Sequence, residues 1–437
     1  MMHEDIADDL VRSCIRCNPV ASANLQRILA DDLVRQAADV LLNAESVPGL
    51  AEALLALSDL LSLDDADRHS IVLHPTFRYW LQAMRRTSGG REPERHRQFA
   101  AELAGLLWGA LAARRKLERP YCVRGDQWGG LRCPALGRYI EFGASYADTA
   151  FTVLPRDQED GVSIHAPDGL TVFVPREDIC GRGAPDANQA EHGYSINVAP
   201  RLAHGAVEVF ARDPWLRVVL TGTMQRQDGT QFFGVSDDLY LRHPPLERLT
   251  AAIELIRREW TPGFADIPLF SRVLVPADFG SGQTSAFTVS SRQGAIFIGD
   301  GSPDELVEMI LHENAHVKLR QIQILDTLLA DPLNEEIRVS VPWRPDPRPM
   351  PGIFEGLFVF AHVAEYHQRR ARNAHCRASQ KRAGKLTRDL EHAASVLAKH
   401  AVLTPRGQLF LGAMCAWVEE LASSKEQPHE RAPDAMH

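Results

Sequence analysis

Residues 294–316 read GAIFIGDGSPDELVEMILHENAH, which holds a strand, a tight turn and a helix start in that order. The apolar run from Gly294 to Ile298 is typical of a strand, and a Gly-Asp-Gly turn follows it. Ser302 then offers a hydroxyl N-cap, a proline fills the first helical position, and Glu305 stands three residues after the cap. We therefore predict a helix that begins here and continues to Leu329.

Two histidines lie on this predicted helix. His312 and His316 are four residues apart, so they share one face about a turn apart, and their imidazoles can converge on one cation. Glu313 lies about 100° around the helix, where it can act as a base or as a hydrogen-bond acceptor for a ligand. The alternative is a pair of surface histidines on an ordinary helix. We predict a metal-dependent enzyme centred on His312 and His316.

A catalytic metal also needs a third protein ligand and at least one open position. The next predicted helix, Ile353 to Arg372, carries Glu355 and His362, which are about 10.5 Å apart along the axis and too far apart to share an ion. Glu355 is the first choice, because it lies in the first helical turn beside Gly356, which permits close helix approach, and His362 is the fallback. The structural alternatives are a carboxylate favoured by the helix dipole and a buried histidine.

A proline-rich segment, residues 341–351, separates the two helices. Its prolines fix the backbone, so we predict a stiff, non-helical connection. In an extended chain Arg344, Asp346 and Arg348 lie on one side, whereas polyproline geometry separates them. Two arginines beside a metal site suit bidentate capture of a carboxylate. Alternatively, they cap helix ends or pair with Asp346 and Glu355.

The pattern of apolar and turn residues divides the chain into four regions. Residues 1–119 have helical periodicity, residues 120–300 contain short β-branched and aromatic runs between turn residues, residues 301–422 are helical again, and residues 423–437 form a flexible tail. The helices are expected at 25–44, 50–63 and 99–117, and the strands at 138–142, 149–154, 170–174, 206–210, 216–220 and 231–235. We therefore predict an α+β fold with a helical N-terminal part, a central, mostly antiparallel β region and a C-terminal helical part that carries the HExxH helix.

The amino-acid composition argues against some classes of function. The chain has 437 residues, of which 45% are hydrophobic, and a net charge of −9 from 48 basic and 57 acidic residues. This balance leaves no basic footprint for nucleic acid. The acidic N-terminus does not resemble a signal peptide, no apolar run approaches the ~20 residues of a membrane helix, and seven scattered cysteines argue for reduced thiols. We expect a cytoplasmic protein without a nucleic-acid or membrane partner, and the sequence leaves its oligomeric state open.

With these motifs in place, the chain resembles the HExxH-type peptide β-hydroxylases, which use iron and 2-oxoglutarate and are catalogued as HEXXH-motif peptide modification proteins. The resemblance rests on the strand from Gly294, on His312-Glu-x-x-His316-x-x-Leu, and on Pro342-Trp-Arg-x-Asp-Pro-Arg-Pro349 with the aromatic-rich helix after it. It covers about residues 290 to 370 and, more faintly, His74-Pro-Thr-Phe-Arg-Tyr-Trp80.

The resemblance implies an Fe(II) and 2-oxoglutarate-dependent oxygenase that hydroxylates the β-carbon of a side chain in a ribosomally synthesised precursor peptide. For the far carboxylate of 2-oxoglutarate, Arg348 is the first choice and Arg344 the second. Where the family has Gln or His, this chain has Glu355, which makes the site similar to a zinc-dependent gluzincin peptidase with Glu313 as general base. A third possibility is a non-catalytic partner that binds the precursor peptide.

Overall fold

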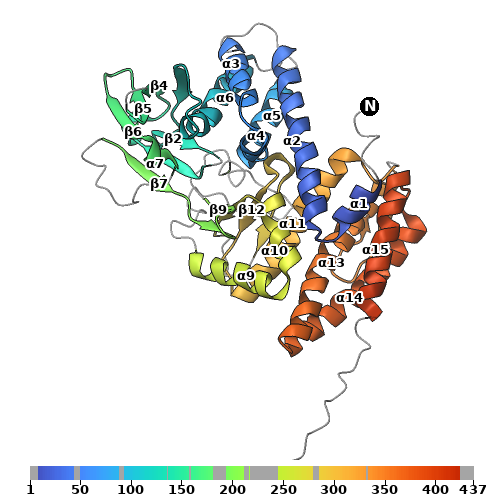
Figure 1. Cartoon of the computed structure of the whole chain (residues 1–437). Coiled ribbons are helices and arrows are strands. Elements are labelled where there is room, and N and C mark those ends of the chain that lie inside the picture. Colours follow the sequence, from blue (N-terminus) through green and yellow to red (C-terminus); the bar gives the residue numbers. More distant parts are fainter. Residues whose placement is uncertain are drawn as a thin grey trace, which may run out of the picture. The chain divides into compact units, whose positions relative to one another are not determined.

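Helices occupy both ends of the chain and strands lie between them, as the computed structural model shows (Figure 1). The predicted α+β class is thus confirmed, with antiparallel sheets in the central part. The structure describes residues 8–43, 50–87, 93–134, 136–156, 159–180, 193–210, 216, 245–278, 285–330 and 333–423. The strand predicted at 231–235 lies outside these residues, as does that at 216–220 except for Leu216.

The chain folds into two compact units. The first, here called the helical unit, consists of residues 1–25, 247–270 and 301–437, and the second, the sheet unit, of residues 26–246 and 271–300. Each unit is therefore assembled from segments that are far apart in the sequence.

The helical unit contains the helices of the C-terminal part together with helices from earlier in the chain. Its elements are α1 (Asp8–Ile15), the start of α2 (Pro19–Leu42), α9 (Leu246–Glu259), α10 (Thr261–Phe270), α11 (Pro303–Leu325), α12 (Leu333–Glu336), β13 (Arg338–Val339), β14 (Arg348–Pro349), α13 (Met350–Asn373), α14 (Arg377–His400) and α15 (Pro405–Ser423). Helices α13, α14 and α15 pack side by side (Figure 1). Among the described helices, none is long and apolar enough to cross a membrane.

Helices α9 and α10 lie within the region that was expected to be mostly β. The buried side chains of α9 include Leu249, Ala252, Ile253 and Ile256, which recur with the period of a helix. This 3.6-residue period distinguishes the segment from its β neighbours, although the run is short enough to be missed among strands.

The sheet unit combines the rest of α2 with further helices and all the longer strands. The helices are α3 (Leu50–Leu61), α4 (Asp65–Val72), α5 (Pro75–Thr87), α6 (Pro93–Ala113) and α7 (Arg176–Cys180), with 3₁₀ turns η1 (Ala144–Tyr146) and η5 (Ser290–Arg292). The strands are β1 (Tyr121–Arg124), β2 (Gly130–Cys133), β3 (Arg138–Glu141), β4 (Ala150–Arg156), β5 (Gly161–His165), β6 (Thr171–Pro175), β7 (Ser195–Val198), β8 (Arg201–Leu202), β9 (Val207–Val209), β10 (Val273–Pro276), β11 (Ala286–Phe287) and β12 (Ala295–Ile298).

These strands form three sheets. Two are antiparallel, in the orders β1-β4-β5-β6 and β2-β3-β7, and the third has the order β11-β12-β10-β9-β8. In the third sheet β10 runs parallel to both β9 and β12, and its residues, like those of β12, are buried throughout. A parallel strand covered on both faces reads as a continuous apolar run, and β12 is the strand predicted from Gly294 to Ile298.

The start of α11 is as predicted, but its end is not. The Ser302 side chain accepts the Glu305 backbone N–H, and the Glu305 carboxylate accepts the Ser302 N–H, which completes a capping box. The helix ends at Leu325 rather than at Leu329. The reason is Asp326, whose carboxylate accepts hydrogen bonds from the Leu328 N–H and the Thr404 hydroxyl, both at 2.8 Å, and so draws the chain out of the helix.

A buried ion pair joins the middle of α11 to α10. Lys318 and Asp266 of α10 are both fully buried, and the Lys318 Nζ lies 2.8 Å from Asp266 Oδ2. Lys318 also donates to the Arg16 carbonyl at 3.0 Å, and the Ser22 hydroxyl donates to Asp266 Oδ1. Burial opposes the charge on Lys318, but the attraction and hydrogen bond of Asp266, together with Cys17 and Cys14, outweigh it and raise the pKa of Lys318. Lys318 therefore keeps its charge, and hydrogen bonds connect the pair to the start of the chain.

Lys318→Met should lower the free energy of unfolding by about 3–5 kcal/mol, because it leaves the Asp266 carboxylate buried without its counter-charge. Chemical denaturation measures this loss, and Lys381→Met, at an exposed position of α14, is the matched control. The double variant Lys318→Met/Asp266→Leu should recover part of the stability, since it removes both charges. A loss no larger than that of the control would show that the pair does not stabilise the fold.

Candidate metal site

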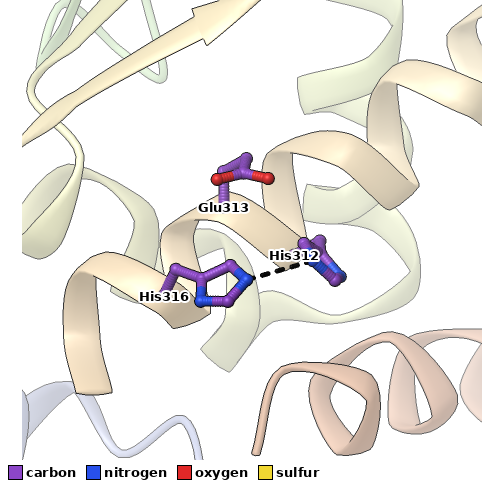
Figure 2. A group of neighbouring side chains, drawn as sticks. All are labelled: His312, Glu313 and His316. Atoms are coloured by element: carbon purple, nitrogen blue, oxygen red, sulfur yellow. Dashed lines mark hydrogen bonds between the residues drawn. The ribbon is translucent and has the colours of Figure 1, made fainter. Parts of the chain in front are cut away.

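Helix α11 brings the two motif histidines together (Figure 2). The Nε2 atoms of His312 and His316 lie 3.2 Å apart, and the two rings are 4.8 Å apart between centroids. Glu313 is buried, and each of the three residues offers a ligand atom within 4.8 Å of the others. Among the described residues, His312, Glu313 and His316 form a group of side chains close enough together to hold one metal ion. The predicted pair at the centre of the site is therefore correctly arranged for shared coordination.

Burial makes both imidazoles good metal ligands. It lowers the pKa of His312 to about 4 and, with a further contribution from His312 and Arg320, that of His316 to about 3. Both rings are thus neutral near pH 7, the state in which an imidazole coordinates a metal. Two facing Nε2 atoms at 3.2 Å can share one proton, or both can direct lone pairs at a cation. The donor set fits a divalent ion.

Helix α13 supplies the predicted carboxylate. Glu355 Oε2 lies 3.8 Å from His316 Nδ1, which is buried and has no hydrogen-bond partner. Burial raises the pKa of Glu355, and Arg320 opposes this shift. Glu355 is not one of the three grouped residues, but it stands beside one of them. From this position Glu355 can either coordinate the ion or accept a hydrogen bond from His316 Nδ1–H, which would orient the imidazole for coordination.

The fallback ligand lies in another environment. The Nδ1 atom of His362 is 2.9 Å from the Phe358 carbonyl oxygen, within the same helix. Its ring packs against Phe358, Trp417 and Trp260, and burial lowers the pKa of His362 to about 3. The structure therefore does not bring His362 to the histidine pair, in line with the two helical turns that separate it from Glu355.

The two arginines of the proline-rich segment share one carboxylate. Arg344 Nε lies 3.5 Å from Asp346 Oδ1, and Arg348 Nε lies 3.2 Å from Asp346 Oδ2. The segment is non-helical from Val341 to Pro349, as predicted, but its last two residues already belong to α13. It turns at Pro342 and becomes extended only at Arg348, in β14. Pairing with Asp346 is one of the structural alternatives foreseen for these arginines.

A residue of the same segment that was not singled out lies closer to the histidines. Trp343 packs against Phe360 at 5.3 Å between ring centroids, and Phe360 packs against His312 at 5.0 Å. A Cβ atom at Gly356 would lie 2.6 Å from the Trp343 ring. Gly356 thus leaves room for the indole, and two half-buried aromatic rings line the site beside His312.

Arg320 is a second residue that the sequence reasoning missed. It is half-buried on α11, one turn beyond His316, and its charge acts on both His316 and Glu355. The signal was available, because a residue four positions after a ligand lies on the same helix face. A guanidinium here can neutralise an anionic ligand of the site.

Comparison with models of protein families gives no match for this chain, and comparison with curated proteins gives none either.

Metal titration against a competing chelator, under anaerobic conditions for Fe(II), tests the site. His312→Ala and His316→Ala should each weaken binding more than about 100-fold, because two protein ligands do not hold a divalent ion well. Glu355→Ala should match them if Glu355 is a ligand, whereas a loss of only about 10–100-fold would assign it the hydrogen bond to His316. His362→Gln and the exposed His392→Ala are the controls that should bind normally. Unchanged binding in both α11 variants would place the metal elsewhere.

Proposed function

We propose that this protein is an Fe(II) and 2-oxoglutarate-dependent oxygenase that hydroxylates a side chain of a ribosomally synthesised peptide in the cytoplasm. The observation that carries the proposal is the pair of neutral, facing imidazoles of His312 and His316 with the Glu355 carboxylate beside them. Two histidines and one carboxylate with open positions are the donors that non-haem Fe(II) oxygenases use. The sequence resemblance to HExxH-type peptide β-hydroxylases supports the same reaction.

In this reaction His312, His316 and Glu355 would hold the iron. Iron(II), dioxygen and 2-oxoglutarate together supply an oxidant that inserts one oxygen atom into a C–H bond, while 2-oxoglutarate leaves as succinate and carbon dioxide. The chain orients the reactants. Trp343 and Phe360 offer an apolar wall beside His312 that excludes water from the reacting side chain, and it is a suitable surface for the substrate.

The co-substrate brings an anionic carboxylate that needs a positive partner. Arg320 acts electrostatically on both His316 and Glu355, whereas Arg344 and Arg348 already share Asp346. A guanidinium binds a carboxylate in a fork and does not lose its proton. Arg320 therefore joins Arg348 and Arg344 as a candidate for the far carboxylate of 2-oxoglutarate.

A zinc peptidase is the second candidate, and one observation favours it. Glu313 is buried and belongs to the same compact group as the two histidines, which is where a hydrolase needs a general base for its water. In that mechanism Glu313 takes the proton from the water and later passes it to the leaving amine. An oxygenase needs no such base.

Activity with a peptide library separates the two reactions. With Fe(II), oxygen and 2-oxoglutarate, we expect succinate release and peptides heavier by one oxygen atom, and Glu313→Gln should keep the metal and measurable turnover. Cleaved peptides with zinc and without 2-oxoglutarate, lost in Glu313→Gln, would assign the peptidase. An intact protein that binds peptide without metal or turnover would be the non-catalytic partner.

The arginine variants locate the co-substrate. Arg320→Met should raise the 2-oxoglutarate concentration for half-maximal succinate release at least about 30-fold, since loss of a buried charged partner costs about 2 kcal/mol or more. Arg344→Met and Arg348→Met are matched changes, and their effect should be smaller because the charge that acts on His316 and Glu355 is that of Arg320. The reverse order of effects would return the role to Arg348. Iron content, measured in parallel, should not change in any of the three.

A further inference from the structure

The segment from His74 to Trp80, which carries the fainter part of the sequence resemblance, belongs to the sheet unit and has no role in the candidate metal site. It forms the first turns of α5. His74 and Arg78 lie one helical turn apart, and they are only 4% and 8% exposed. A polar side chain buried this deeply needs partners, so the groups around Arg78 indicate what this segment does.

Arg78 has few partners for its charge. Its Nη1 donates to Gln293 Oε1 at 2.7 Å, while its Nε is buried and has no hydrogen-bond partner. Burial and the like charge of Arg272 together lower the pKa of Arg78 to about 9. Within the part of the chain that the structure describes, the charged group that acts on Arg78 is thus a second cation, and no carboxylate pairs with it.

Arg272 directly precedes β10, and its backbone N–H donates to the Gly294 carbonyl at 2.8 Å, next in sequence to the Gln293 that Arg78 contacts. It is half-buried, and its guanidinium forms no hydrogen bond or ion pair within the described chain. Burial lowers the pKa of Arg272 to about 10, and the charge of Glu208 opposes the shift. Glu208 itself already serves other groups, because Arg201 Nη2 lies 2.7 Å from its Oε1 and His74 Nε2 lies 3.6 Å from its Oε2.

A further arginine, Arg138, adds positive charge near Glu208. Arg138 of β3 acts electrostatically on Arg201 and Glu208, and its Nε is also buried without a hydrogen-bond partner. Glu208 acts electrostatically on Arg138, Arg201 and Arg272, and Asp178 acts on Arg138. Within the described chain, neither carboxylate is among the charged groups that act on Arg78.

A guanidinium keeps its proton even when buried, so this excess of positive charge must be compensated in another way. An oxyanion fits best, because its oxygens accept the paired N–H donors of a guanidinium fork. We propose that the sheet unit binds a small oxyanion, a carboxylate or a phosphate, between Arg78 and Arg272. Arg272 and Arg138 are half-buried and thus partly accessible to solvent, whereas Arg78 is buried.

The surrounding structure holds the donors in place. The Arg292 guanidinium lies 3.5 Å from the centre of the Tyr79 ring, next in sequence to the Arg78–Gln293 hydrogen bond. This double contact fastens α5 to η5. The site is independent of the proposed oxygenase reaction, because none of its residues belongs to the helical unit.

Calorimetric titration of the full chain tests the proposal. The buffer contains EDTA, so that phosphate cannot bind through a metal ion. Inorganic phosphate or malonate should bind saturably with one site per chain, and chloride at matched ionic strength should not. Arg78→Met and Arg272→Met should each weaken binding about tenfold or more, because a charge-assisted pair is lost. Arg85→Met, an exposed arginine on the same helix, should bind like the parent protein.

Saturable binding should also raise the thermal midpoint by a few degrees in the parent protein and in Arg85→Met only. Preference for phosphate would identify a phosphorylated ligand, and preference for malonate a carboxylate. The proposal is overturned if neither anion binds saturably, or if all variants bind alike. If circular dichroism shows that Arg78→Met is unfolded, the half-buried Arg272→Met decides alone.

Discussion

The buried ion pair between Lys318 and Asp266 is the constraint on which the helical unit depends. Lys318 follows His316 by two residues, which is about 200° around α11, so the lysine points away from the face that carries the histidines. Asp266, Ser22 and the Arg16 carbonyl satisfy this pair, and they come from the start of the chain and from α10. One face of α11 is thereby held in the core, and the other can present His312 and His316 as a fixed pair.

The candidate site is completed by packing around α13 more than by the motif itself. Gly356 leaves room for the Trp343 indole, which rests on Phe360, and Phe360 rests on His312. The proline-rich segment thus contributes an aromatic ring to the site, and its arginines balance Asp346 beside it. Because Glu355 precedes Gly356, the same short stretch positions the carboxylate and admits the ring.

The two units differ in how their buried charges are paired. In the helical unit the buried charge of Lys318 meets that of Asp266, so the fold itself accounts for the cost of burying this pair. Among the described residues of the sheet unit, Arg78 contacts Gln293 and is acted on by another cation. A stable fold tolerates such an imbalance at places where a ligand completes it, so unbalanced burial distinguishes a binding site from a structural pair.

Local patterns in the sequence were sufficient for the helix that starts at Ser302, for the strand before it and for the histidine pair, because each depends on hydrogen bonds and spacings within a few residues. The distance along one helix axis showed that Glu355 and His362 cannot share an ion, and the position beside Gly356 near the helix start favoured Glu355. Arg320, Trp343 and the division into two units required the tertiary structure, as did the early end of α11 at Asp326. These features arise from contacts between residues far apart in the chain, and only folding determines which distant side chains meet.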